Sequence, residues 1–226
     1  MIQWIRMLFI NKQNYVWYLG YGSNLEKQRF LCYIVGGQPR GSNKVYDGAR
    51  DKTPPLFSNK FIINHDLYFS KNSSAWNNGG VAFIDVELSN SAKTLARVYL
   101  ITRQQFEDVA RQETSSDNVL PIAFGQAIQN GFTIFKSPSW YGNVLNIGTK
   151  KGCPILALTS ENTIQEYVKP DPAYLLTIMR GIHEVFKITP KEMASYFSRK
   201  RGVSGNYTDT EIEDLAKSIV NPRIKK

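Results

Sequence analysis

Short runs of β-branched and aromatic residues recur along the chain and limit its fold more than any other feature. Such runs, bounded by turn residues, are typical of β-strands. They lie at residues 16–19, 61–69, 81–86, 95–101 and 132–135. A hairpin is expected from 144–147 to 154–158, turning through the glycine-bounded segment 148–152. The sequence therefore predicts six or seven strands.

Helix start signals lie between these runs. Three pairs have the spacing of a capping box: Ser23 and Glu26, Thr102 and Gln105, and Thr189 and Glu192. The first pair predicts a helix through about residue 35. Asp171-Pro172 opens another helix, and a last short one is expected over 211–220. The apolar stripe of the Asp171-Pro172 helix consists of Leu175, Ile178, Met179, Ile182 and Phe186.

These strands and helices do not alternate strictly, which favours an α+β fold with a curled sheet or small barrel over a doubly wound sheet. The 226 residues suffice for one elaborated domain. We expect a ragged leader at 1–14, with Met7 as an alternative start, a main domain at 15–200 and a C-terminal extension with a short helix at 201–226. A Gly-, Pro- and Lys/Arg-rich segment at about 36–60 shows no periodicity and predicts a functional or mobile insertion.

The net charge of +9 is concentrated toward the two ends of the chain. It is +6 over residues 1–60, −1 over 61–186 and +4 over 187–226. Such a balance can reflect nucleic-acid binding, a solvated surface or a field that attracts small anions. No recognition-helix, zinc-finger or RNP-type motif accompanies the charge, so nucleic acid is not the favoured partner.

Other features exclude several classes of protein. No apolar run approaches the roughly 18 residues of a membrane span, so no membrane partner is expected. Two cysteines, Cys32 and Cys153, cannot form a disulfide framework, which favours a reducing, cytoplasmic compartment and core positions for both. His65 and His183 have no neighbouring ligand set, so we expect no metal and no cofactor.

The sharpest local motif is the segment Tyr18–Leu25, in which a predicted strand passes through two glycines into a helix start. This arrangement exposes backbone N–H groups that suit a carboxylate, a phosphate or a developing oxyanion. The dinucleotide fingerprint fails because Leu25 replaces its third glycine, and a nucleophile elbow fails because Ser23 is not in a G-x-S-x-G context. A tight turn capped by Ser23 is the structural alternative.

Glu113 is the strongest candidate for acid–base chemistry. It follows Phe106, Val109 and Ala110 on one face of the helix predicted after residue 102, so its carboxyl continues the apolar stripe. Glu107 and Asp108 fall outside that stripe and are expected to be solvated. Desolvation would raise the pKa of Glu113 toward the range of a general acid or base. Alternatively, Glu113 ends the helix in a salt bridge or in water.

Four segments together resemble the gamma-glutamylcyclotransferase-like family, which includes gamma-glutamylamine cyclotransferases and plant avirulence-induced proteins. Tyr18–Leu25 is similar to its Y-x-x-Y-G-S-N-L loop, and residues 76–84 are similar to its W-x-G-G-[IV]-A segment. The strand and helix from Arg97 to Glu113 resemble those that lead to its catalytic glutamate, and residues 170–184 resemble its P-x-P-x-Y…G-x-x-E helix. The basic insertion, a longer connection after Glu113 and Thr114 in place of a frequent glycine depart from the family pattern.

The resemblance implies a small closed mixed β-barrel surrounded by helices, with one pocket between the glycine loop and Glu113. The implied reaction closes a γ-glutamyl group to 5-oxoproline and releases an amine or amino acid, with Glu113 as general acid and base. The implied substrate-binding residues are Tyr18, Leu19, Gly20, Tyr21, Gly22, Ser23 and Tyr174. Taken alone, Tyr174 is most simply a core or rim aromatic.

The expected ligand is therefore a small anionic compound of γ-glutamyl type, and a homodimer is left open. An alternative use of the same fold is to bind or sequester a small anionic metabolite or a nucleotide conjugate. In that case, Arg40, Lys44, Arg50 and Lys52 of the insertion would cover the anion cradle as a lid.

Overall fold

The structure is a computed structural model that describes residues 10–42 and 44–220. The strands are β1 (Tyr15–Gly20), β2 (Phe57–Ile63), β3 (Leu67–Ser73), β4 (Gly79–Ile84), β5 (Thr94–Thr102), β6 (Phe132–Ile134), β7 (Asn143–Lys150) and β8 (Cys153–Thr159). The helices are α2 (Lys27–Val35), α3 (Arg103–Glu113), α4 (Phe124–Asn130), α5 (Pro172–Phe186), α6 (Pro190–Phe197) and α7 (Asp209–Val220). Short 3-10 turns are η1 (Lys12–Asn14), η2 (Ser23–Leu25) and η3 (Ser74–Trp76).

Six strands form one mixed sheet in the order β2-β5-β1-β8-β7-β6, while β3 and β4 form a separate antiparallel ladder. Within the sheet, β1 is antiparallel to β5 and parallel to β8. The α+β class with a mixed sheet among helices is thus confirmed. Within the described ranges, this sheet does not close into the expected barrel, because its outer strands β2 and β6 are not paired with each other.

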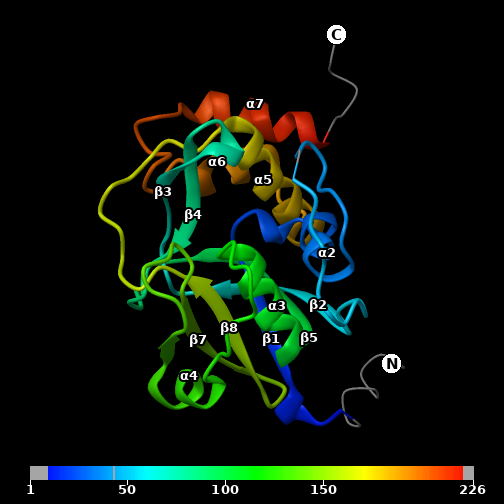
Figure 1. The fold of residues 1–226 in the computed structure, drawn as a ribbon. Coiled ribbons are helices and arrows are strands. Elements are labelled where there is room, and N and C mark those ends of the chain that lie inside the picture. The colour runs from blue at the N-terminus through cyan, green and yellow to red at the C-terminus, as the bar shows by residue number, and fades with distance from the viewer. Residues whose placement is uncertain (1–9, 43, 221–226) are drawn as a thin grey trace.

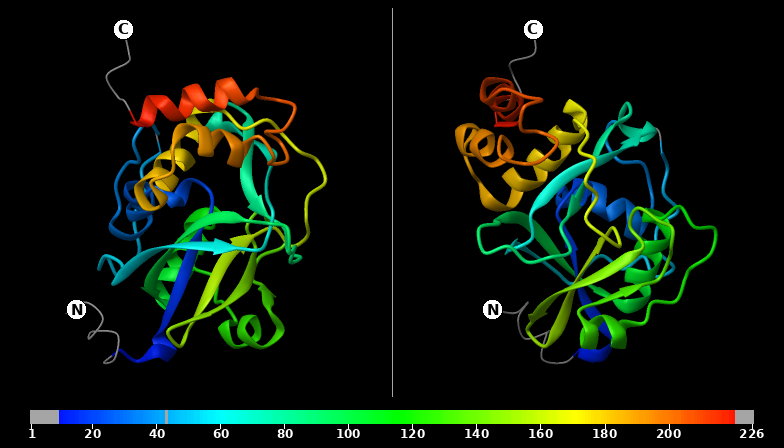
Figure 2. Two further views of the ribbon diagram at one scale, coloured as in Figure 1. Left: turned by 180° about the vertical axis from the view of Figure 1, so that it is seen from behind. Right: turned by 90° about the vertical axis from the view of Figure 1, so that its left-hand side faces the viewer.

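Both faces of this sheet are covered, as the alternation along β1 shows. Val16 and Tyr18 point into a buried cluster with α2, α3 and α4, whereas Trp17 and Leu19 point into a second cluster with α5, α6 and α7. Figures 1 and 2 show α5, α6 and α7 stacked at one end of the molecule and α4 at the other. The end of β1 therefore lies between two packed layers, and this is where the glycine loop begins.

The strands differ from the prediction at two places. The run at 61–69 forms parts of two strands, β2 and β3, with a turn at residues 64–66 in which the buried His65 ring is hydrogen-bonded to the Asp85 carbonyl (2.8 Å). The predicted hairpin is present, but its turn lies at Lys151 and Gly152, and Gly148 belongs to β7 next to a register shift. Helix α4 was not predicted from the sequence.

Two of the three capping boxes are confirmed, and the one at Ser23 is wrong. Thr102 and Thr189 each cap their helix reciprocally with the residue three positions on. At Ser23 the chain forms the short turn η2, and α2 begins only after Glu26. The Ser23 hydroxyl instead accepts a hydrogen bond from Arg29, and the Glu26 carboxylate is bound by Arg180, so neither side chain is available to cap the helix.

The insertion is attached to α3 by an ion pair whose carboxylate is buried. Asp108, expected to be solvated, is only 1% exposed and accepts hydrogen bonds from the backbone N–H (2.9 Å) and Nε (2.8 Å) of Arg50. Tyr46 and Ala49 of the insertion are also buried. Because β2 starts at Phe57, the irregular segment ends before residue 60. The insertion is thus packed against the helix that ends at Glu113.

The ends of the described chain contact the main core. Residues 1–9 of the expected leader at 1–14 lie outside the described residues. In its remaining part, Lys12–Asn14 form η1 directly before β1. In the C-terminal extension, Ile212 and Ala216 of α7 are buried in the same cluster as α5 and α6, and residues 221–226 lie outside the description. None of the described helices is long and apolar enough to cross a bilayer.

Candidate functional site

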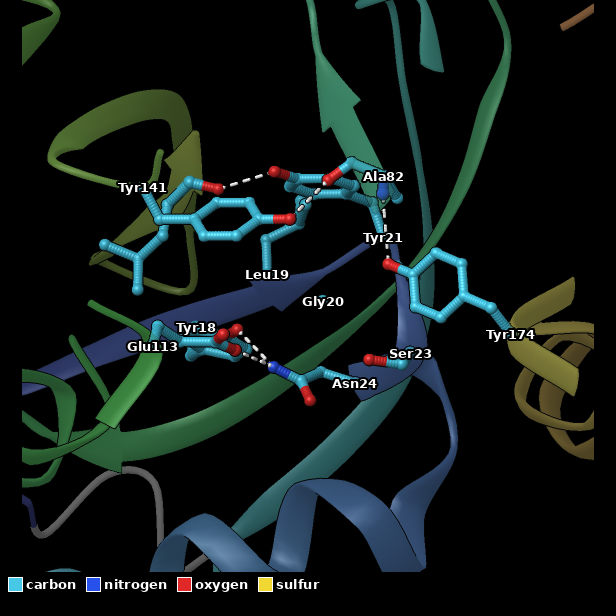
Figure 3. A pocket seen from close by; sticks show the side chains of 12 residues that line it. Tyr18, Leu19, Gly20, Tyr21, Ser23, Asn24, Ala82, Glu113, Tyr141 and Tyr174 are labelled. Carbon is cyan, nitrogen blue, oxygen red and sulfur yellow. Dashed lines mark hydrogen bonds between the residues drawn. The ribbon is translucent and has the colours of Figure 1, made fainter. Parts of the chain in front are cut away.

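One pocket lies at the carboxyl end of β1 and brings together every residue that the motifs proposed for the site (Figure 3). Its cavity volume is about 40 Å³, and it opens to solvent on one side. Its walls come from the glycine loop, β4, β8, the end of α3, α5 and the segment before β7. The lining residues are Tyr18, Leu19, Gly20, Tyr21, Gly22, Ser23, Asn24, Ala82, Glu113, Tyr141, Leu158 and Tyr174.

Close packing leaves little room for a side chain at either glycine of the loop. A Cβ atom at Gly20 would lie 3.0 Å from the Asn24 carbonyl oxygen, and one at Gly22 would lie 3.1 Å from the Tyr174 hydroxyl. The loop then folds back through a hydrogen bond from the Leu25 N–H to the Gly22 carbonyl (3.0 Å). Any side chain at Gly22 would therefore project into the pocket beside Tyr174.

Glu113 is the last residue of α3, and its carboxyl faces the glycine loop. Asn24 Nδ2 donates to Glu113 Oε1 at 2.6 Å, and no cation of the described chain lies within 4.0 Å of this carboxyl. Burial raises the pKa of Glu113 above its ordinary value, although Arg29 and the Asn24 hydrogen bond act in the opposite direction. The salt-bridge alternative is thus wrong, and the pKa is shifted in the direction that acid–base chemistry requires.

Tyr18 lies beside Glu113 and remains neutral. Its hydroxyl accepts a second hydrogen bond from Asn24 Nδ2 (2.8 Å), and its ring stacks on Phe30 with centroids 4.9 Å apart. Burial, followed by the negative charge of Glu113, raises the pKa of Tyr18 well above its usual value. Asn24 thus holds the carboxyl of Glu113 and the phenol of Tyr18 in fixed positions.

Tyr174 reaches the opposite side of the pocket from the first turn of α5, as Figure 3 shows. Its hydroxyl accepts a hydrogen bond from the Ala82 N–H (3.0 Å), and its ring packs 4.8 Å from that of Trp76. Burial raises the pKa of Tyr174 to about 12, so its hydroxyl keeps its proton near neutral pH. The alternative of a simple core aromatic does not account for a hydroxyl that lines the pocket.

The Trp76–Ile84 segment positions Tyr174 through its paired glycines. A Cβ atom at Gly79 would lie 2.5 Å from the backbone nitrogen of Asp171, and one at Gly80 would overlap the Val168 carbonyl. These contacts let β4 lie directly against the chain that enters α5. Asp171 caps α5 by accepting from the Ala173 N–H (2.7 Å), which fixes the turn that carries Tyr174.

Two further tyrosines of the wall donate their hydroxyl protons to the backbone. Tyr21 donates to the Leu158 carbonyl (2.6 Å), and Tyr141 donates to the Ala82 carbonyl (3.0 Å). Tyr141 was not predicted from the sequence, because it reaches the pocket from the segment before β7 and no local motif surrounds it. Their protons are engaged, so these side chains shape the pocket more than they offer hydrogen bonds.

Sequence reasoning also missed Asn24 as a contact of Glu113, and it missed Arg29. Asn24 lies inside the glycine motif, and the only sequence signal for its role was that an asparagine side chain can donate hydrogen bonds. Arg29 follows one turn later on α2, and its Nε donates to the Ser23 hydroxyl at 2.8 Å. The available signal for Arg29 was its position on the buried face of a predicted helix. Arginine is seldom buried without a partner, so a buried arginine indicates a specific contact.

The site thus contains a carboxyl with a raised pKa (Glu113), a hydroxyl bonded to a guanidinium (Ser23 and Arg29) and a glycine loop. Among the described residues, no histidine or cysteine lines this pocket. Within the same ranges, no group of three or more His, Cys, Asp or Glu side chains is arranged to hold a metal ion. The arrangement suits proton transfer at Glu113 next to hydrogen-bond donors for an anion.

No family model matches the chain. Among curated proteins, it is similar to histone deacetylase 5 of Arabidopsis thaliana, with 37% identity over 200 residues. That match covers 81% of this chain and 30% of the relative, so the chain spans less than a third of the length of that protein.

Three solved structures resemble the chain at low identity. One is a gamma-glutamyl cyclotransferase (16% identity, TM-score 0.48), and one is an uncharacterised protein from Homo sapiens (18% identity, TM-score 0.46). Each of these two matches covers 90% of this chain and 99% of the other. The third is a yeast gamma-glutamyl cyclotransferase specific to glutathione (14% identity, TM-score 0.30), covering 94% of this chain and 90% of the other.

Proposed function

We propose that this protein is a gamma-glutamylcyclotransferase-like enzyme, which converts a γ-glutamyl compound into 5-oxoproline and a free amine or amino acid. The observation that carries this proposal is the environment of Glu113. Its carboxyl is partly buried, has a raised pKa, is held by Asn24 and faces the glycine loop across one pocket. The family resemblance of the four sequence motifs supports the same reaction.

The reaction is an intramolecular aminolysis that requires no nucleophile from the enzyme. Glu113 takes a proton from the α-ammonium group, and the freed amine attacks the γ-carbonyl carbon of the same glutamyl unit. A C–N bond closes the five-membered ring while the bond to the leaving nitrogen breaks. Glu113 then returns its proton to that nitrogen, so one carboxyl acts as base and as acid.

The glycine loop supplies the complementary electrostatics. In the proposed reaction, backbone N–H groups between Gly20 and Ser23 hold a carboxylate or the oxyanion of the tetrahedral intermediate. One such donor is typically worth about 2.7–4 kcal/mol of transition-state stabilisation. The rest of the pocket holds amine and carbonyl in contact, which removes much of the entropic cost of ring closure.

The direct test is product analysis with a panel of γ-glutamyl amines and γ-glutamyl dipeptides. We expect 5-oxoproline to accumulate in step with the released amine, as measured by mass spectrometry. If a metabolite extract instead yields an intact bound anion and no panel member is cleaved, the sequestration alternative holds. The structure gives little support to the lid that this alternative requires. Two of its four basic residues are engaged elsewhere, because Arg50 is paired with Asp108 and Lys52 donates to the Asp47 carbonyl.

Asn24→Ala tests how the pKa of Glu113 is set. The hydrogen bond from Asn24 lowers the pKa of Glu113, so its removal raises that pKa further. A general base must be deprotonated, and we therefore expect the acid limb of the pH–rate profile to move to higher pH. Activity should fall most at the acid end and recover partly as the pH rises.

The matched control for this variant is Asn146→Ala. Asn146 lies on β7, outside the pocket lining, and its side chain bonds only to nearby backbone groups in the described part of the chain. We expect its acid limb to coincide with that of the parent protein. An unshifted limb in Asn24→Ala would contradict the proposed role of the Asn24 hydrogen bond.

A further inference from the structure

Arg29 is a buried cation without a carboxylate partner. Its residue is 8% exposed, and no acidic group of the described chain lies within 4.0 Å of its guanidinium. Its contacts are the Ser23 hydroxyl (2.8 Å), the Tyr46 hydroxyl (3.3 Å) and the face of Trp76, 5.2 Å from the ring centroid. By contrast, Arg50, Arg97, Arg180 and Arg201 each pair with a carboxylate.

This guanidinium keeps its charge. Burial lowers the pKa of Arg29, but the neighbouring groups Tyr33, Tyr46 and Glu113 outweigh that effect and hold the pKa above its usual value. A buried charge is costly unless it meets a counter-charge. Glu113 is the one carboxylate among these groups and does not contact Arg29, so the guanidinium, which is bonded to the Ser23 hydroxyl, also favours an anionic group on that side of the pocket.

The bond to Arg29 determines the orientation of the Ser23 hydroxyl. A guanidinium can only donate, so Ser23 Oγ must accept from Nε. The hydroxyl proton of Ser23 is then free to point elsewhere, and the described residues offer it no acceptor while Ser23 lines the pocket. The Ser23 hydroxyl can therefore donate a hydrogen bond to a ligand in the pocket.

Tyr174 is oriented in the same way from the other side. Because its oxygen accepts from the Ala82 N–H, its own proton is also available to the pocket. Tyr21 and Tyr141, in contrast, donate to backbone carbonyls. In Figure 3, Ser23 and Tyr174 lie on one side of the pocket and Glu113 lies on the other. The two sides therefore suit opposite ends of a zwitterion.

We propose that Arg29 is a positioning residue that makes the Ser23 side of the pocket an anion subsite for the α-carboxylate of the ligand, opposite Glu113, which receives the α-amino group. This inference rests on the proposed function and specifies how the glutamyl head is oriented and selected. The insertion takes part through Tyr46, whose hydroxyl contacts both Arg29 Nη2 and the Tyr33 hydroxyl at 3.3 Å.

The test compares the binding of 5-oxoproline with that of its carboxamide, which has the same ring but no negative charge. The parent protein should prefer the carboxylate by about ten- to a hundredfold, the range of one charge-assisted hydrogen bond. Arg29→Gln should lose most of that preference, whereas Arg29→Lys should retain part of it. Tyr46→Phe, which leaves the pocket lining intact, should weaken the preference in the same direction by a smaller factor.

Titration calorimetry measures these affinities independently of turnover, and circular dichroism verifies that each variant is folded. An unchanged carboxylate preference in a folded Arg29→Gln variant, with 5-oxoproline still released from the substrate panel, would overturn this inference alone. A parent protein that releases no 5-oxoproline and binds neither compound would overturn the proposed function together with it.

Discussion

Glu113→Gln is expected to abolish the release of 5-oxoproline while leaving the fold intact. A positioned general acid or base typically contributes about 10²- to 10⁴-fold to the rate, and here one carboxyl serves both proton transfers. Glutamine has the same size and keeps an oxygen that can accept the 2.6 Å hydrogen bond from Asn24. The loss should therefore appear mainly in kcat, measured by product formation at saturating substrate.

Although Glu113→Gln should lose activity, we do not expect it to lose stability. The pKa of Glu113 is raised in the folded protein, so above the usual glutamate pKa the unfolded chain releases its proton before the folded one does. Glu113 thus contributes less to stability as the pH rises through this window. Because glutamine cannot ionise, we expect the variant to be at least as stable as the parent at neutral pH, measured by thermal unfolding at several pH values.

Glu107→Gln on the same helix is the matched control. Glu107 lies 3.6 Å from Arg50 and outside the pocket lining, so we expect turnover close to that of the parent. Full activity in Glu113→Gln would contradict the catalytic role. Equal losses in both variants would instead indicate a general disturbance of α3.

The sequence was informative where a local pattern and the final environment agree. The order of polar and apolar residues on α3 was enough to place Glu113 on the buried side, and the glycine motif was enough to locate the loop. Both signals depend only on residues that are close in the chain. The α+β class followed from the mixture of strand runs and capped helices for the same reason.

The failures arose where a distant partner competed for a side chain. Ser23 had the spacing of a helix cap, yet Arg29 donates to its hydroxyl and Arg180 removes Glu26 from the box. Asp108 was expected in solvent because its position on α3 is off the apolar stripe, but the insertion covers it and pairs it with Arg50. Such contacts depend on the tertiary fold, so helical periodicity alone could not have found them.

Gly181→Ala is expected to be strongly destabilising and to disturb the site. Gly181 lies inside α5, where a Cβ atom would overlap the carbonyl carbon of Leu25 and the nitrogen of Glu26. These are backbone atoms of the loop that lines the pocket, so they cannot move aside as a flexible side chain would. Overpacking typically costs about 1–3 kcal/mol and occasionally more, while alanine returns up to about 1 kcal/mol of helix propensity.

We therefore expect a net loss of about 2 kcal/mol in the free energy of unfolding of Gly181→Ala, measured by guanidinium denaturation. A shift of the loop away from α5 would also displace Gly22 and Ser23, so activity should fall below the level explained by the unfolded fraction. Gly125→Ala is the matched control, because Gly125 is also helical and a Cβ there would meet nothing within 4 Å. That variant should be at least as stable as the parent. If both substitutions left stability unchanged, α5 and the loop would not be in the close contact that holds Tyr174 and Ser23 on the same side of the pocket.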